Sequence, residues 1–322
     1  MFNLEAGSPR TSRGPREPAA CALILAGGDG ARLRQLTREI SGDDRPKQFC
    51  PVLGTDFLLD QTRRRARLVA PDARTLVVVT RAHERFYRET ETANAALVVQ
   101  PENRGTVPAI LYALLRLATT APASPVAILP SDHYVSDDRA FMAHVEAALG
   151  VAHRRADLVI LLGIAANRPE PQYGWIEPAE PIFGSWPCDL YRIRRFVEKP
   201  APALAHVLWT AGALWNSFVM VGRVTALLST IRGAVPALFE SFLPLRAALG
   251  TPDEAAAVER LYCGLPAADF SRDVLATRPA NLAVLPVKGV DWNDLGDPDR
   301  VRMVRRQLEA RRQAGGLTWA TR

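Results

Sequence analysis

The stretch ALILAGGDGARL, residues 22–33, is expected to decide the fold of the chain. Its first half is a continuous apolar run, which is typical of a buried strand in a parallel sheet. Gly27, Gly28 and Gly30 follow directly and allow a ligand to approach the backbone closely. Arg32 stands at the expected start of a helix, where backbone N–H groups and the helix dipole favour an anion. The segment indicates either a phosphate-binding loop or an ordinary tight turn between a strand and a helix.

Two common nucleotide-binding patterns do not fit this loop. The dinucleotide pattern G-x-G-x-x-G, started at Gly28, requires a third glycine where Leu33 stands. No acidic residue follows the second expected strand, where Thr80 and Arg81 stand, so a Rossmann oxidoreductase is disfavoured. The P-loop pattern requires a Gly-Lys pair, and the sequence contains none.

Apolar runs alternate with helical patterns through the first half of the chain. Continuous runs predict buried strands at 21–26, 75–80, 96–99, 125–130 and 157–163. Helical periodicity predicts helices at 57–70, 82–92, 107–118 and 138–152. This alternation predicts an α/β fold of Rossmann-like type, with a mixed, mostly parallel sheet and helices on both faces. In such sheets, ligands bind beyond the carboxyl ends of the strands.

The second half of the chain is more mixed. Further strands are expected at 190–200, 213–222 and 281–287, with helical segments over 223–262. Residues 178–189 have the composition of a loop, which we expect to form an insertion over the active site.

The C-terminal region carries the excess positive charge. The formal net charge is +6, and residues 300–322 hold seven of the 40 basic residues but one of the 34 acidic ones. Val301, Val304 and Leu308 recur at helical spacing, which predicts an amphipathic helix with a solvated basic face rather than a nucleic-acid-binding surface. We therefore expect a disordered tail over 1–18, one domain over 19–298 and a basic helix over 299–322.

Cysteines and lysines are sparse. The four cysteines lie far apart without a C-x-x-C pair, which fits a reducing cytoplasm, and no apolar run reaches the roughly 18 residues of a membrane span. We expect a cytoplasmic protein with no nucleic-acid or membrane partner.

Only three of the 40 basic residues are lysines, so Lys47 and Lys199 indicate sites that need a compact ammonium group, whereas Lys288 is interpreted as structural.

The pair AGGDGARL (26–33) and PKQF (46–49) resembles the sugar-1-phosphate nucleotidyltransferases, in particular their mannose-1-phosphate guanylyltransferase branch. With this pair counted as one motif, seven motifs in register are specific where one alone is weak. The others follow in the family's order and are QPENRGTVPAI (100–110), LPSDH (129–133), YGWIE (173–177), FVEKP (196–200), LWNSF (214–218) and DWNDLG (291–296).

The resemblance implies attack by a sugar-1-phosphate oxygen on the α-phosphate of a nucleoside triphosphate. The expected substrates are GTP and mannose-1-phosphate, and the products are GDP-mannose and pyrophosphate. Since the attacking oxygen is already anionic, no general base is needed. Cations and a metal ion must instead screen two polyanions. Arg32 and Lys47 are the candidates for holding the phosphate oxygens.

The expected cofactor is Mg²⁺, which takes oxygen ligands from one or two carboxylates, water and phosphate. Asp132 follows an apolar strand at its carboxyl end, and the resemblance makes Asp294 the second ligand. Asp291 is a rival for that position. Taken singly, Asp132 equally suits a helix or turn cap, and Asp294 a turn before Gly296.

The resemblance also implies the substrate-binding residues. The nucleotide is expected to contact Ala26, Gly27, Gly28, Gly30, Gln100, Arg104, Gly105 and Thr106. The sugar phosphate is expected to contact Gly174, Glu198, Lys199 and Asn216. Lys199 would neutralise its phosphate and Asn216 would hydrogen-bond ring hydroxyls, whereas Glu198 could form an ordinary ion pair.

Two residues depart from the family pattern. Ala31 stands where the family usually has threonine, and Phe218 where it commonly has glycine. Phe218 adds a large ring beside the expected sugar pocket, so it bears on the identity of the sugar. The alternatives are the same chemistry with another substrate pair, such as thymidylyl or uridylyl transfer to a hexose or heptose phosphate, and a regulatory homologue that binds nucleotide sugar without catalysis. A bifunctional enzyme is not expected, and a homodimer is left open.

Overall fold

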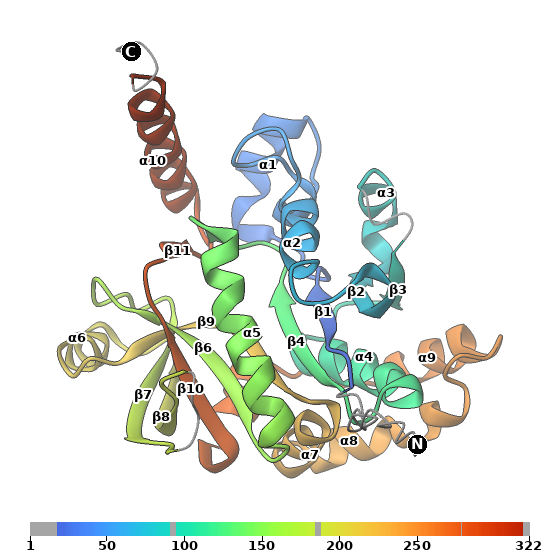
Figure 1. Ribbon diagram of the computed structural model, residues 1–322. Helices are drawn as coiled ribbons and strands as arrows, with labels where there is room; N and C mark the ends of the chain where they lie inside the picture. The colour runs from blue at the N-terminus through green and yellow to red at the C-terminus, as the bar shows by residue number, and fades with distance from the viewer. Residues whose placement is uncertain (1–17, 91–94, 184–187, 278, 318–322) are drawn as a thin grey trace, which may run out of the picture.

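The computed structural model describes residues 18–90, 95–183, 188–277 and 279–317, and it centres on a nine-stranded sheet (Figure 1). The strand order is β3-β2-β1-β4-β9-β6-β10-β8-β7. These strands are β1 (Cys21–Leu25), β2 (Thr75–Thr80), β3 (Ala96–Gln100), β4 (Pro125–Pro130), β6 (Val159–Ala165), β7 (Gly174–Pro181), β8 (Tyr191–Glu198), β9 (Leu214–Arg223) and β10 (Leu282–Val287).

Seven of these strands run in one direction. β1 pairs in parallel with β2 and β4, β2 with β3, and β6 with β10. β9 lies antiparallel between β4 and β6, and β8 lies antiparallel between β10 and β7. The predicted α/β fold with a mixed, mostly parallel sheet is therefore confirmed, and β8 and β9 are the strands that oppose the others.

Helices cover both faces of the sheet (Figure 1). Side chains of β1 alternate between two cores, so that Leu23 packs beneath one layer of helices and Ile24 beneath the other. The first layer comprises α4 (Thr106–Thr120), α7 (Val224–Ala234), α8 (Pro236–Ser241) and α9 (Glu254–Tyr262). The second comprises α2 (Leu58–Ala66), α3 (Glu84–Tyr87), α5 (Asp138–Arg154) and α6 (Pro202–Thr210).

The prediction of a loop over 178–189 is wrong for its first part. Residues 178–181 belong to β7, which pairs with β8 from Gly174 opposite Glu198 to Pro181 opposite Tyr191. Residues 182–183 and 188–190 therefore lie at the end of the hairpin remote from Gly174, and residues 184–187, on which part of the expected insertion falls, are outside the described part. Two prolines, Pro178 and Pro181, hide this strand in the sequence. β7 also pairs with β9 at Trp175 and Ile176, and the prolines are tolerated because they lie beyond that pairing, where β7 is at the sheet edge.

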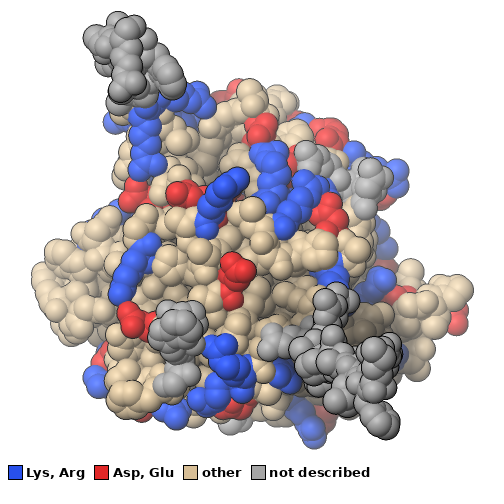
Figure 2. Space-filling model, viewed as in Figure 1, with Lys and Arg blue, Asp and Glu red and all other residues tan. Residues whose placement is uncertain are grey.

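The C-terminal helix α10 (Pro298–Leu317) packs against the segment that follows the glycine loop. Val301 and Val304 share a buried cluster with Leu33, Val52 and Leu58. Arginines line the outer side of the helix, where Figure 2 shows basic side chains gathered, while basic and acidic groups intermix over the rest of that face. The expected disordered tail lies, except for its last residue, outside the described residues.

A membrane-spanning helix is not evident in the described residues. No single helix there is long and apolar enough to cross a bilayer, and one sharply bent pair, Val224–Ala234 with Pro236–Ala247, meets the criteria by length and composition only.

Gly105 lies at the N-terminus of α4 in close contact with another segment, and its substitution can be compared with that of Gly212, which has no such contact. Gly105 has φ +87°, and a Cβ there would collide with the carbonyl oxygen of Ala268. Gly212 has φ +75° but faces open space. We expect Gly212→Ala to lower the free energy of unfolding by about 1 kcal/mol from backbone strain alone, and Gly105→Ala by at least about 3 kcal/mol because a clash is added. Urea denaturation measures both, and equal losses would contradict this packing.

Candidate active site

A cleft of about 330 Å³ opens at the carboxyl ends of β1, β2, β3 and β4. This is the edge of the sheet at which ligands of α/β proteins bind. Six residues expected from the sequence line it, namely Gly27, Gly28, Gln100, Gly105, Thr106 and Asp132. Asn103, His133, Phe218 and Asp269 complete the polar and aromatic part of its wall.

The glycine loop is fixed by side chains that hold its carbonyl oxygens. Gln48 donates from Nε2 to the carbonyl oxygens of Ala26 at 3.0 Å and Gly28 at 2.7 Å. Thr80 donates from Oγ1 to the carbonyl of Gly27 at 3.0 Å. Because the carbonyl groups are bound from within the protein, the loop is rigid before any ligand arrives. Gln48 belongs to the PKQF motif, but the sequence alone predicts no role for it.

Arg32 lies in the short 3-10 helix that follows the loop, Ala31–Leu33. Its side chain is exposed, and among the described residues it forms no hydrogen bond or ion pair. Gly30, at φ +60°, precedes this turn, and a Cβ there would press on Pro46 and the backbone of Lys47. The arginine is therefore an unengaged cation beside the loop, as a phosphate ligand requires.

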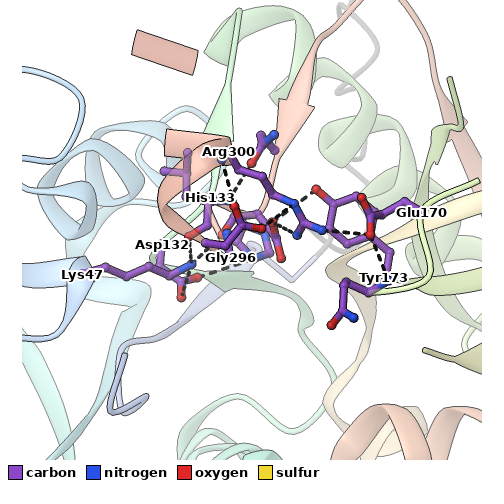
Figure 3. A network of polar contacts seen from close by, with 12 residues as sticks. Lys47, Asp132, His133, Glu170, Tyr173, Gly296 and Arg300 are labelled. Carbon is purple, nitrogen blue, oxygen red and sulfur yellow. Dashed lines mark hydrogen bonds and ion pairs between the residues drawn. The ribbon is translucent and has the colours of Figure 1, made fainter. Parts of the chain in front are cut away.

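Lys47 joins three parts of the chain. Its buried ammonium group donates to the carbonyl oxygens of Asp294 at 2.5 Å and Leu295 at 3.1 Å, and it lies 3.3 Å from Oδ2 of Asp132 (Figure 3). These contacts satisfy all three of its protons. A phosphate oxygen can reach Lys47 only where it adds to or replaces the contact with Asp132.

A second, two-stranded sheet brings the aspartates together. β5 (Tyr134–Val135) pairs antiparallel with β11 (Trp292–Asn293). Since Asp132 lies just before one strand and Asp294 just after the other, this pairing places both at the same end. Strands of two residues are too short to produce an alternating pattern, so the sequence did not predict them.

Asp294 is held by three donors to a single oxygen. Its Oδ1 accepts from Arg300 Nη1 at 2.8 Å, the hydroxyl of Tyr173 at 3.2 Å and the backbone N–H of Gly296 at 2.9 Å (Figure 3). Burial alone would raise the pKa of this carboxyl, but the charges of Arg300 and Lys47 outweigh it and the pKa is lowered. The group is therefore an anion in a buried setting.

Arg300 corrects the expectation of a uniformly solvated basic face on the last helix. The residue is 7% exposed and forms ion pairs with Glu170 at 3.0 Å and Asp297 at 3.1 Å, as well as with Asp294. Its guanidinium also lies 4.5 Å from the centre of the Tyr173 ring. Charge pattern could not reveal this, because its partner Glu170 lies 130 positions earlier in the sequence.

Asp132 and Asp291 have different surroundings. The Asp132 side chain is partly exposed to the cleft and lies 3.5 Å from Nε2 of His133, whose pKa is lowered by burial. Asp291 is exposed and paired with Arg311 at 2.7 Å, and it borders a different cavity, between β11 and α10. Lys288 forms a surface ion pair with Asp189 at 3.0 Å.

The part of the cleft wall formed by Gln100, Asn103 and Thr106 carries polar side chains whose orientation is fixed by hydrogen bonds. Gln100 accepts from the Tyr262 hydroxyl at 3.1 Å through Oε1, which leaves Nε2 beside Gly27. Asn103, which lines the cleft, donates from Nδ2 to Asp29 at 2.8 Å. Thr106 uses its hydroxyl oxygen to accept from the N–H of Phe270 at 2.7 Å. Of the residues expected here, Arg104 points instead to Glu102, at 2.7 Å.

The four residues expected to bind the sugar phosphate converge at the ends of β7, β8 and β9. A Cβ at Gly174 would lie 2.8 Å from Oε2 of Glu198 and 3.3 Å from Cβ of Asn216, so only glycine allows this approach. Lys199 lies 3.2 Å from Glu198. Asn216 accepts from the N–H of Phe218 at 3.0 Å, which turns the Phe218 ring toward the cleft.

Comparison with known proteins identifies a matching family and several relatives. A family described as "Nucleotidyl transferase" matches residues 21–311. The alginate biosynthesis protein AlgA of Pseudomonas aeruginosa is 33% identical over 215 residues, 65% of this chain and 43% of the relative. A mannose-1-phosphate guanylyltransferase of Escherichia coli is 28% identical over 283 residues, 85% of this chain and 57% of the relative. The chain thus spans about half the length of the curated relatives it matches.

A solved structure is similar as well. A Thermus thermophilus protein, described as a mannose-1-phosphate geranyltransferase, superposes with a TM-score of 0.74 at 31% sequence identity. The match covers 86% of this chain and 76% of that one.

The buried Glu198 carboxyl makes stability depend on pH. Burial raises its pKa, and the Lys199 ammonium offsets only part of this. The folded protein then binds the proton more tightly than the unfolded chain, so stability falls as pH rises from about 4, the ordinary glutamate range, through the raised value. We expect Glu198→Gln to gain stability relative to the unmodified protein between about pH 4 and pH 7, as measured by urea denaturation. Glu240→Gln, at an exposed position, controls for loss of a carboxylate, and a difference independent of pH would contradict the prediction.

Proposed function

The chain belongs to the nucleotidyl transferase family, and from this premise we propose that it transfers a nucleotidyl group from GTP to mannose-1-phosphate. The products would be GDP-mannose and pyrophosphate. The observation that carries the proposal is that Lys47 contacts both Asp132, which lines the cleft beside the glycine loop, and the backbone of Asp294. The names of the relatives from Escherichia coli and Thermus thermophilus support mannose-1-phosphate as the acceptor.

We propose Mg²⁺ as the cofactor, held by Asp132 and by Oδ2 of Asp294. Among the described residues no group of three or more His, Cys, Asp and Glu side chains suits a metal. Two carboxylates do suit Mg²⁺, which keeps water and takes phosphate oxygens as its other ligands. When bound, the ion would polarise the α-phosphate and screen the departing pyrophosphate.

The protein residues would act mainly by position and charge. N–H groups of the glycine loop and the free guanidinium of Arg32 would hold the triphosphate, with its β and γ oxygens toward Arg32. Lys47 would screen the charge that develops near Asp132. Since the acceptor phosphate is already anionic, no residue would need to remove a proton.

The acceptor would lie between Gly174, Asn216 and Lys199, with Lys199 at the phosphate. The Lys199 side chain is more than half exposed and can reach a ligand, whereas the Glu198 side chain beside it is 22% exposed. Phe218 lies two residues after Asn216 and lines the nucleotide cleft. Its ring would therefore favour an acceptor of limited bulk on the side that faces it.

Two alternatives are open. The same chemistry with another triphosphate or sugar phosphate would use the same cations and carboxylates. A regulatory homologue without catalysis would not need Arg32, Lys47, Asp132 and Asp294 in this arrangement, so their presence favours an enzyme. We also propose a cytoplasmic location, supported by four cysteines that form no disulfide. A homodimer is left open.

The proposed function is tested by a panel of nucleoside triphosphates against sugar-1-phosphates, scored by Mg²⁺-dependent release of pyrophosphate. GTP with mannose-1-phosphate should give the highest kcat/KM. A higher value for another pair would replace the substrates and keep the chemistry, whereas no release with any pair would support the regulatory homologue.

Substitution of the two carboxylates tests the metal assignment. Asp132→Asn and Asp294→Asn should each lower kcat by about 100-fold or more, because a metal supplies several kcal/mol of charge stabilisation. Asp291→Asn is the matched control and should stay near the unmodified rate. Circular dichroism checks the fold, and near-normal pyrophosphate release from either of the first two variants would refute their role.

Substitution of Lys199 is expected to affect the binding of one substrate and not the other. Lys199→Ala should raise the KM for the sugar phosphate by about 10-fold or more, since one charge-assisted contact to phosphate is lost. The KM for the triphosphate should change little. Steady-state kinetics with each substrate varied in turn gives both values, and equal effects on the two would exclude the assigned role.

A further inference from the structure

We propose that Arg300 is a positioning residue for the metal site, because it fixes the orientation of the Asp294 carboxylate. This inference rests on the proposed function, in which Asp294 is a metal ligand. Within the described part of the chain, Arg300 contacts neither the cleft nor any residue assigned to the substrates, so its action would pass through Asp294 alone.

The two carboxylate oxygens of Asp294 have different hydrogen-bond partners. Oδ1 accepts three hydrogen bonds, from Arg300, Tyr173 and Gly296. Among the described residues Oδ2 accepts none, although the side chain is only 16% exposed. An ionised carboxylate has further acceptor sites on each oxygen, so Oδ2 keeps its lone pairs for a cation. The three donors to Oδ1 thus leave Oδ2 as the oxygen that is available to bind a metal ion.

Arg300 is itself immobilised from outside the site. Its Nη2 pairs with Glu170 Oε1 at 3.0 Å and its Nε with Asp297 Oδ2 at 3.1 Å, while the guanidinium lies over the ring of Tyr173. Glu170 is fixed in turn, since its carboxylate accepts from the N–H of Gln172 at 3.0 Å. Such outer contacts orient ligands in metal sites and are worth about 10- to 100-fold in metal affinity.

Positioning differs from simple charge compensation. If Arg300 acted only through its positive charge, which favours the ionised form of Asp294, a lysine at this position would leave metal binding unchanged. If Arg300 positions Asp294 through its planar guanidinium, a lysine weakens metal binding although the charge is kept. Arg300→Lys therefore distinguishes the two roles.

The experiment measures Mn²⁺ binding to the full chain by electron paramagnetic resonance of the free ion, with a GTP analogue whose α–β bridge cannot be cleaved. Arg300→Met removes charge and hydrogen bonds, and Arg300→Lys keeps the charge but loses the planar fork. We expect both to raise the Kd for Mn²⁺ by about 10-fold or more. Arg302→Met is the control on the same helix, where Arg302 is exposed and paired with Asp299, and it should not change the Kd.

The outcomes distinguish this inference from the proposed function. Asp294→Asn serves as the reference for loss of the ligand itself. If Asp294→Asn weakens Mn²⁺ binding and the Arg300 variants do not, the positioning role is overturned and the metal site stands. If Asp294→Asn has no effect, the metal assignment fails and the inference fails with it. Should circular dichroism show that Arg300→Met is unfolded, Arg300→Lys decides, because an unchanged Kd with the charge retained would overturn positioning.

Discussion

The Lys47 ammonium group is the contact on which the arrangement of the site depends. It is buried, and it binds two carbonyl oxygens that lie 247 and 248 positions later in the chain, as well as the carboxylate of Asp132. A buried ammonium without such partners would cost several kcal/mol. The folded state therefore requires the end of β4, the PKQF turn and the segment around Asp294 to meet at one point, and that point borders the cleft.

Backbone strain is concentrated around the same place. The three non-glycine residues with positive φ among those described are Lys199 at 46°, Phe218 at 58° and Leu295 at 49°. Each is held by a hydrogen bond from its own N–H, to Tyr173, Asn216 and Asn293 respectively. Such conformations cost about 1–3 kcal/mol each and persist where the surroundings impose them, typically at functional sites. Two of the three lie in the proposed acceptor region, and the third follows a proposed metal ligand.

The sequence was sufficient to predict the positions of most strands of the sheet, because buried parallel strands are continuous apolar runs. The strands at 75–80 and 125–130 begin and end where expected. Residues that follow these strands, such as Asp132, could be placed at the site from the rule on carboxyl ends. Arg300, Asp269 and Gln48 could not, because their roles arise from contacts between distant segments and not from local pattern. β7 was missed since an edge strand tolerates the prolines that otherwise indicate a loop.

The proposed function depends most on one metal ion being shared by Asp132 and Asp294 beside the glycine loop. Anomalous X-ray scattering from crystals grown with Mn²⁺ and an uncleavable GTP analogue would locate this ion. We expect a single strong peak bound by Asp132 and by Oδ2 of Asp294, with the α-phosphate oxygen as a further ligand and Arg300 still on Oδ1. A peak bound by Asp291, or one with no contact to Asp294, would contradict it.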